Sequence, residues 1–507
     1  MVSLKALLRA KSFRKKRALE IMFSLFDRRD ACWFALIFAA LLARLALSAP
    51  IWQHGEAREG LVVWGIVHNN EWILPFRNGE LPSKPPLFHW LAALCALILG
   101  MDDFAVRLPS ALAAEVLAVT TYIVGRAAGN RMTGWLSVGA LLGMYEFWDS
   151  GTQARVDMLF SACVAVSLAG FFFWYRDRRD AARAVCYVAA ALAVLTKGPA
   201  GVVLPALVIG VFLAAQRELR LLAELWSWPL AASALIVDLG WYAWAYHIGG
   251  DAFLRLQLVH ENFDRALGLA EIGESRNYLA PVVWLVSRTA PWSLALVWSA
   301  VRRSRGERED DAGRFLHSWW MVVLIVFTLA VGKRAVYLLP LYPAIAVLAA
   351  RAIRALATRW FCERPDDPGD SWAAAMPLFV RRLVSARGIF VALIICDLTL
   401  MLADRDFWRD AKPRRARLAF VAKIGAILPP QQPLAASPEL ENSLLIVIAY
   451  RLRREIERKP VASGARNDFF LVPLDSPAYS KIRARFLAWS EIDRIGLLRL
   501  LSRNPSS

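Results

Sequence analysis

The chain has 507 residues, of which 57% are hydrophobic and 11% aromatic, and its mean hydropathy is +0.40. This composition excludes an ordinary water-soluble globular protein and is typical of a protein that crosses a membrane many times. The net charge is +18, but the cations lie in short segments between apolar runs, which indicates membrane topology and argues against a nucleic-acid partner.

Apolar runs of roughly 15 to 22 residues are long enough for helices that cross a hydrocarbon core about 30 Å thick. We predict an all-α polytopic membrane protein with about eleven transmembrane helices. The segment 85–100 is apolar but short, so we expect a juxtamembrane or re-entrant helix there. The predicted spans are 31–49, 108–126, 133–149, 158–175, 184–196, 200–215, 227–246, 279–300, 315–332, 336–350 and 388–403.

The charge distribution predicts which ends of these spans lie inside. Residues 1–30 form a basic cytoplasmic leader, and every predicted inner loop is rich in arginine. Residues 31–403 then form the transmembrane domain, with outer loops at 51–107 and 150–157. The polar tail 404–507 contains strand-like LLIVIAY and DFFLVPL, which predicts a small extracytoplasmic α/β domain.

Ionisable residues gather at the predicted outer ends of the spans. Glu56, Arg58 and Glu59 follow the first span, and Lys84 precedes two prolines that stiffen the start of the next apolar segment. Arg155 and Asp157 lie where a later span begins. A charge buried in the bilayer costs roughly 2.5 to 3.5 kcal/mol, so charges here tend to be paired or functional. The alternative for the residues that follow the first span is a solvated loop. The alternative for Arg155 and Asp157 is an interfacial anchor.

A second basic cluster lies on the same predicted face. Lys333, Arg334 and Tyr337 stand at the start of an inward span. Cations on the outer face oppose the usual charge bias, and an anionic ligand such as a phosphate would explain them. The alternative is a belt of interfacial tyrosines with snorkelling cations.

Metal and nucleotide signals are weak. His260 and Glu261 are adjacent, which is not the spacing of a helical metal site, so we expect a polar outer loop there. The six cysteines form no CxxC pair, and no GxxxxGK phosphate loop occurs. The motif LTKGPAG is a Gly and Pro helix break that holds Lys197 on the outer face.

Carboxylates and cations beside lipid-accessible helices suit the transfer of a group from a lipid phosphate. Glu56 or Asp157 can act as a general base on an incoming hydroxyl. Fixed cations can stabilise the negative charge that grows on a phosphate leaving group. The candidate cations are Lys84, Arg58, Arg155, Lys333 and Arg334.

Several segments resemble, in order, the superfamily of bacterial aminoarabinose transferases and protein O-mannosyltransferases, which are membrane glycosyltransferases of the GT-C fold. The resemblance covers about residues 30–350. It implies that residues 31–403 are a catalytic domain that moves a sugar from a polyprenyl phosphate, undecaprenyl phosphate in bacteria, on the outer side of the inner membrane. The segments are HGEAREG, NNEWILPFRNGELPSKPPLFHWLAAL, DDFAVRLPSAL, ARVDMLF and LAVLTKGPAGVVLP.

The resemblance also implies roles for single residues. Glu56 and Asp157 match acidic residues of the family's active site, and Arg58 matches an arginine that follows the acidic pair. Lys84 matches the lysine that meets the donor phosphate, and Tyr337 resembles a tyrosine near that phosphate.

Two positions depart from the family's pattern. Gly55 stands where an aspartate is common, and Ser83 stands where a glutamate precedes the Lys-Pro pair. The second change removes a candidate metal ligand, so we predict neither a required metal nor a cofactor.

The expected partners are a polyprenyl-phosphate-linked sugar donor, membrane lipids, and an acceptor that is lipid A, another lipid, a glycan or a protein. Two other functions stay open at the level of the sequence. One is a transporter or flippase for a lipid-linked saccharide, although no inverted repeat is apparent. The other is an inactive GT-C scaffold, which the glycine at position 55 would favour.

Overall fold

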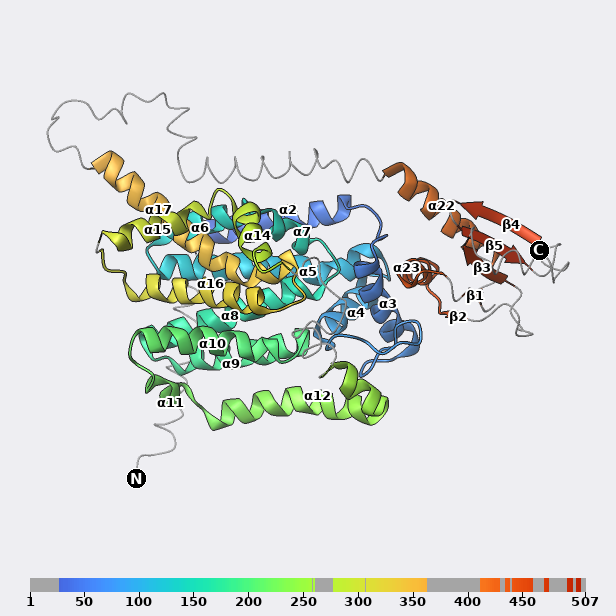
Figure 1. Cartoon of the computed structure of the whole chain (residues 1–507), viewed down its shortest axis with the longest axis horizontal. Helices are drawn as coiled ribbons and strands as arrows, with labels where there is room; N and C mark the ends of the chain where they lie inside the picture. Colours follow the sequence, from blue (N-terminus) through green and yellow to red (C-terminus); the bar gives the residue numbers. More distant parts are fainter. Residues whose placement is uncertain are drawn as a thin grey trace.

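The computed structural model describes residues 27–257, 259, 277–305, 307–362, 411–428, 434–437, 440–458, 469–473, 490–495 and 498–502. In Figure 1 the long helices run side by side, and the C-terminal sheet lies at one end of the molecule. The leader up to residue 26 and the span predicted at 388–403 lie outside the described residues. The first helices are α2 (Arg28–Leu47), α3 (His54–Asn69), α4 (Leu87–Leu99), α5 (Asp103–Ala127), α6 (Arg131–Leu142), α7 (Tyr145–Gly151), α8 (Val156–Asp177), α9 (Asp180–Lys197) and α10 (Ala200–Ala215).

The helical part also contains a short 3-10 helix, η2 (Ala335–Leu341), which directly precedes the last helix of this part, α17 (Tyr342–Cys362). The remaining elements of this part are α11 (Leu221–Leu225), α12 (Trp228–Leu254), α14 (Ala280–Thr289), α15 (Leu294–Ser304) and α16 (Asp311–Leu329). Five of the described helices are long and apolar enough to span a membrane, or six if α14 and α15 count as one bent span. The chain is therefore a mostly helical multi-pass membrane protein, while the count of about eleven spans stays a prediction.

Two predicted spans are broken, so their prediction as continuous helices was wrong. The span predicted at 133–149 is split at Gly143, and the indole N–H of Trp148 donates to the carbonyl of Leu142 at 2.7 Å, which satisfies a carbonyl freed by the break. The span predicted at 279–300 bends by 104° where Pro291, which has no N–H to donate, separates α14 from α15.

The predicted outer loop 51–107 is largely helical. The short helix expected at 85–100 is confirmed as α4, but the helix α3 before it was not expected from the sequence. Glu56, Arg58 and Glu59 lie on a helix rather than in a solvated loop, and both glutamates are buried. The solvated-loop alternative is therefore wrong for both carboxylates.

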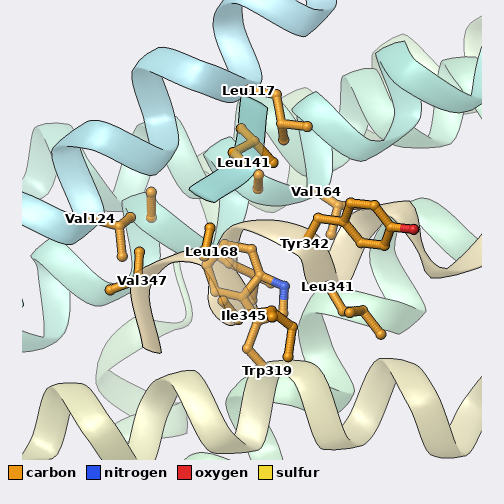
Figure 2. Close-up of a cluster of buried hydrophobic side chains, with 14 of the residues drawn as sticks. Leu117, Val124, Leu141, Val164, Leu168, Trp319, Leu341, Tyr342, Ile345 and Val347 are labelled. Carbon is orange, nitrogen blue, oxygen red and sulfur yellow. The ribbon is translucent and has the colours of Figure 1, made fainter. Parts of the chain in front are cut away.

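The core of the bundle forms where six elements converge. Figure 2 shows side chains from α5, α6, α8, α16, η2 and α17 packed together, with the fully buried Trp319 among them. Close helix approach helps this packing, because a Cβ atom at Gly170 of α8 would lie 2.7 Å from the backbone nitrogen of Cys186 in α9. Fully buried, well-packed side chains of this kind give the bundle a single arrangement.

A buried carboxylate joins three helices at the end of the bundle opposite to Glu56. Asp30 of α2 is fully buried. Its oxygens accept hydrogen bonds from Tyr122 of α5 at 3.1 Å and, from α6, from the guanidinium of Arg131 at 2.8 Å and the indole of Trp135 at 2.9 Å. These charge-assisted bonds hold α2, α5 and α6 in register.

The C-terminal segment is an α/β unit in the described residues. Its sheet has the order β2-β1-β3-β5-β4, in which β1 pairs in parallel with β2 and β3 while β5 pairs antiparallel with β3 and β4. Its elements are α22 (Ala411–Ile427), β1 (Leu434–Ala436), α23 (Asn442–Leu452), β2 (Ile456–Arg458), β3 (Phe469–Pro473), β4 (Ser490–Ile495) and β5 (Leu498–Ser502).

The strand expected in DFFLVPL is present as β3, whereas the strand expected in LLIVIAY was wrong, because that run lies in the helix α23. An apolar run without alternation does not distinguish a buried strand from a buried helix. The domain boundary near residue 404 stays a prediction.

The Asp30 network yields a stability prediction. Asp30→Ala should lower the free energy of unfolding in detergent by about 1.5 to 3 kcal/mol, the usual value of hydrogen bonds to a charged group. The control is Glu307→Ala, which removes an exposed pair with Arg302 and should change stability by less than about 0.5 kcal/mol. Thermal or denaturant unfolding measures both, and equal losses in the two variants would contradict the structural role of Asp30.

Candidate active site

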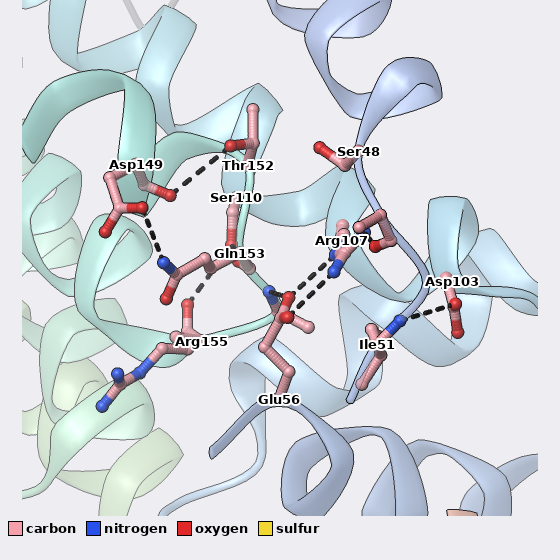
Figure 3. Close-up of polar contacts among 12 residues, drawn as sticks. Ser48, Ile51, Glu56, Asp103, Arg107, Ser110, Asp149, Thr152, Gln153 and Arg155 are labelled. Atoms are coloured by element: carbon pink, nitrogen blue, oxygen red, sulfur yellow. Dashed lines mark hydrogen bonds and ion pairs between the residues drawn. The ribbon is translucent and has the colours of Figure 1, made fainter. Parts of the chain in front are cut away.

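Glu56 is the centre of a buried polar network that joins three segments. Its two carboxylate oxygens accept hydrogen bonds from Nε and Nη2 of Arg107 in α5, each at 2.8 Å. The backbone N–H of Ala154 donates to the same carboxylate at 2.9 Å, and Nη1 of Arg107 donates to the carbonyl of Ala49 at 3.0 Å. Figure 3 shows Glu56 and Arg107 facing each other beside the segment that leads to Arg155.

This geometry explains how one network locates the start of α8. Glu56 and Arg107 are only 4% and 5% exposed, so each charge depends on the other for compensation. Because Ala154 is tied to the same carboxylate, the pair fixes the chain three residues before Asp157. Both oxygens of Glu56 are already engaged, which leaves it poorly suited to take a proton from a substrate.

Arg58 is half-buried and paired with a carboxylate of its own helix. Its Nε donates to Oε1 of Glu59 at 3.0 Å, and the buried His89 of α4 lies 2.7 Å from the other oxygen of Glu59. Burial alone would raise the pKa of Glu59, but Arg58 and His89 hold that pKa well below its usual range. Glu59 therefore stays ionised and ties α3 to the helix that follows Lys84.

Asp157 lies in the first turn of α8 and collects cations from several elements. Nζ of Lys197, the last residue of α9, donates to Oδ1 of Asp157 at 2.7 Å. Nε of Arg155 lies 3.5 Å from Oδ2, and Lys84 is close enough for its charge to act on this carboxylate. The structure thus brings together Lys84, Arg155 and Asp157, which the sequence placed on one face.

Lys197 was not among the residues predicted to bind phosphate. Besides its bond to Asp157, its ammonium lies 4.4 Å from the ring centroid of Tyr337 and 5.1 Å from that of Phe160. The helix break at Gly198, where φ is +78°, ends α9 and leaves Lys197 at this position. The break was visible in the sequence, but its contact with an acid 40 positions earlier was not.

Lys333 lies in the segment between α16 and η2. Its side chain is 1% exposed, and its Nζ has no hydrogen-bond partner among the described residues. The ammonium lies 4.2 Å from the ring centroid of Tyr278, and burial lowers the pKa of Lys333. The neighbouring Arg334 is only half-buried. A buried ammonium whose contact in the described part of the chain is an aromatic face is a favourable place for an anion.

Gly55 faces the guanidinium of Arg155. A Cβ atom at this glycine would lie 3.8 Å from Cζ of Arg155, so an acidic side chain here would be next to that cation. Glu56 does not take this place, since its carboxylate is bound by Arg107. The substitution of the family's aspartate by glycine therefore leaves Arg155 with only the 3.5 Å contact to Asp157 among the ion pairs of the described residues.

The described residues contain no group of three or more His, Cys, Asp or Glu side chains that could hold a metal ion. His260 and Glu261, the adjacent pair considered from the sequence, lie outside the described part of the chain.

Sequence comparison relates the chain to sugar transferases. The family profile described as dolichyl-phosphate-mannose-protein mannosyltransferase matches residues 83–244. An undecaprenyl phosphate-alpha-4-amino-4-deoxy-L-arabinose arabinosyl transferase from Shewanella sediminis is 29% identical over 325 residues, which are 62% of this chain and 58% of the relative. A protein of the same name from Pseudomonas fluorescens is 24% identical over 400 residues, covering 75% of this chain and 65% of the relative. The chain thus spans about three fifths of the length of such curated relatives.

Structural comparison extends the likeness over nearly the whole chain. The crystal structure of ArnT from Cupriavidus metallidurans bound to undecaprenyl phosphate matches with a TM-score of 0.76 and 16% identity, covering 94% of this chain and 98% of that one. The archaeal oligosaccharyltransferase AglB from Archaeoglobus fulgidus matches with a TM-score of 0.52 and 13% identity, covering 87% of this chain and 69% of that one. The chain therefore has the GT-C fold of these structures, and over part of its length its sequence is similar to proteins named as sugar transferases.

Proposed function

We propose that the protein is a membrane glycosyltransferase that moves a sugar from a polyprenyl phosphate, undecaprenyl phosphate in bacteria, to an acceptor hydroxyl. The observation that carries this proposal is the cluster of Asp157, Lys197 and Arg155, with Lys84 close enough for its charge to act on Asp157. The sequence of the chain is similar to proteins named as arabinosyl transferases. One structure similar to this chain, that of ArnT, was solved bound to undecaprenyl phosphate.

Asp157 is the better candidate base of the two carboxylates. Oδ1 of Asp157 is held by Lys197, whereas the Arg155 Nε lies 3.5 Å from Oδ2, which is beyond a normal hydrogen bond. Oδ2 therefore has the capacity to accept a hydrogen bond from an acceptor hydroxyl. In Glu56 both oxygens are held at 2.8 Å by Arg107, so we assign Glu56 to positioning rather than proton transfer.

The cations would stabilise the leaving group. As the acceptor oxygen forms a bond to C1 of the sugar, the bond from C1 to the phosphate oxygen breaks, and its electron pair leaves with the polyprenyl phosphate. The acceptor proton passes to Asp157. Lys197, Lys84 and Arg155 would neutralise the phosphate, and Tyr337, against which Lys197 rests, would keep that ammonium in place.

Two of the predicted phosphate ligands receive different weight. Lys333 is a candidate because its ammonium is buried without a hydrogen-bond partner among the described residues, and the half-buried Arg334 beside it would complete the basic surface. Arg58 is held by Glu59 on α3, so we assign it to shaping the charge near the site rather than to direct phosphate binding.

The proposed location is the periplasmic face of the bacterial inner membrane. The acidic residues Glu56 and Asp157 lie at one end of the bundle, and Asp30 with its arginine partner lies at the other. The arginine-rich end matches the inner side by the positive-inside rule. The donor is a polyprenyl-phosphate sugar, and the acceptor is a lipid such as lipid A, a glycan or a protein. The relatives named as transferases favour this function over a flippase or an inactive scaffold.

The first test removes the proposed base and the central cation. Asp157→Asn should lower the rate of sugar transfer by about 10²- to 10⁴-fold, the usual effect of losing a general base. Lys197→Met should lower it by about 10²- to 10³-fold, because the negative charge that grows on the phosphate would lose one of the cations proposed to stabilise it. The assay follows labelled sugar from undecaprenyl phosphate into membrane acceptors, with purified protein. Full activity of either variant, or lipid movement without a new glycosidic bond, would refute the assignment.

The second test uses the buried ammonium. Lys333→Met keeps the volume of the side chain while removing a buried charge that has no hydrogen-bond partner among the described residues, so we expect it to stabilise the protein by about 1 kcal/mol and yet weaken undecaprenyl-phosphate binding by about tenfold. Arg220→Met, an exposed cation in the connection between α10 and α11, serves as control and should alter neither quantity. Unchanged lipid affinity of Lys333→Met would remove this residue from the site.

The third test asks whether Glu56 is structural. Glu56→Leu leaves Arg107 buried and unpaired, and should destabilise the protein by about 3 to 5 kcal/mol. The double variant Glu56→Leu with Arg107→Met replaces both charges and should recover most of that loss. Unfolding of the two single variants and the double variant in detergent measures the coupling. Additive losses would show that the two side chains do not depend on each other.

A further inference from the structure

The C-terminal unit touches the proposed active-site frame at a glycine of α3. A Cβ atom at Gly60 would lie 2.3 Å from the ring of Tyr450 in α23, so only a glycine lets the tyrosine ring lie against α3. Tyr450 is 5% exposed, and its ring belongs to one apolar cluster with Ala57 and Leu61 of α3 and Phe88 of α4. The C-terminal unit thus shares a core with the helices that surround the candidate site.

The edge of this contact is a hub of hydrogen bonds to Asp103, the first residue of α5. The hydroxyl of Tyr450 donates to Oδ1 of Asp103 at 2.7 Å, and Nη1 of Arg451 lies 2.9 and 2.7 Å from its two oxygens. The backbone N–H of Ile51 donates to Oδ2 at 2.9 Å. Burial and the nearby carboxylate raise the pKa of Tyr450, so its hydroxyl remains a donor at neutral pH.

A second contact reaches the turn that precedes Lys84. The side chain of Asn78 accepts a hydrogen bond from the backbone N–H of Ile456 in β2 at 2.7 Å. Its amide group donates to the carbonyl of the same residue at 3.1 Å. Asn78 is held in a left-handed conformation, with φ of +50°, inside the turn closed by the bonds between Arg77 and Glu80. One side chain therefore satisfies both backbone groups of one residue of the C-terminal sheet.

We propose that the C-terminal unit is a clamp that positions the active-site frame, with Asn78 and Tyr450 as positioning residues. It grips α3, which carries Gly55 and Glu56, and it grips the turn six residues before Lys84. Neither contact residue reaches the reacting groups, so their effect passes through the backbone that they hold. The proposal rests on the proposed transfer reaction for its effect on catalysis, but the clamp itself is testable without that reaction.

The first variant loosens the Lys84 side. Asn78→Gly removes the amide without straining the left-handed backbone. Its matched control is Asn70→Gly, because Asn70 is also left-handed, with φ of +57°, and is exposed. In full-length protein, hydrogen exchange followed by mass spectrometry should show faster exchange over residues 72–86 for Asn78→Gly and no change there for Asn70→Gly. Slower donor capture should follow, as a KM for the sugar donor raised by about three- to tenfold with little change in kcat.

The second variant loosens the α3 side. Gly60→Ala favours the helix itself by about 0.5 to 1 kcal/mol, yet its methyl group forces the Tyr450 ring away. Its matched control is Gly210→Ala in α10, where a Cβ atom meets nothing within 4 Å. Faster exchange in α23 and in residues 51–60 with Gly60→Ala, and none with the control, would support the clamp.

Two results would overturn it. One is unchanged exchange in both interface variants, which would show that the contacts position nothing. The other is faster exchange with unchanged KM and kcat, which would show that the C-terminal unit docks without positioning the site. If the wild-type protein transfers no sugar, the proposed function fails, while the exchange results still decide whether the clamp exists.

Discussion

The ion pair between Glu56 and Arg107 is the constraint on which the proposed site depends. Two charges that are almost completely buried must remain together, because either one alone would carry the full cost of burial. Since the backbone N–H of Ala154 donates to the same carboxylate, the pair fixes the segment that leads into α8 and therefore the position of Asp157. Glu56, which the sequence suggested as a possible general base, instead holds the segment that positions Asp157.

The helix α3 shows why so many charges lie at this end. Three helices contact α3 at different buried residues. Arg107 of α5 binds Glu56, and His89 of α4 binds Glu59. The ring of Tyr450 in α23 packs directly against Gly60. A short helix held on three sides has little freedom to move. In the proposed reaction it would present a fixed electrostatic surface near the lipid phosphate, which is how pre-organised charges lower the cost of a reaction.

The sequence predicted the class of the fold and the end of the bundle where Asp157, Arg155 and Lys84 meet, because charge bias and span length are local signals. It did not predict the roles of Arg107 and Lys197, since their partners lie 51 and 40 positions away and no spacing rule connects them. The breaks at Gly143 and Pro291 were missed because hydropathy measures how apolar a segment is and does not report whether its helix axis is continuous. The helix α23 was mistaken for a strand because its apolar run is buried on every side.

The central claim is that a polyprenyl phosphate is bound by the cations around Asp157. An experimental structure of the protein with undecaprenyl phosphate tests it most directly. The account predicts phosphate oxygens within about 3 Å of Lys197 and of Lys84 or Arg155, with Arg107 still bound to Glu56. A phosphate found at the opposite end of the bundle, beside Asp30 and Arg131, or one that displaces Glu56 from Arg107, would contradict it.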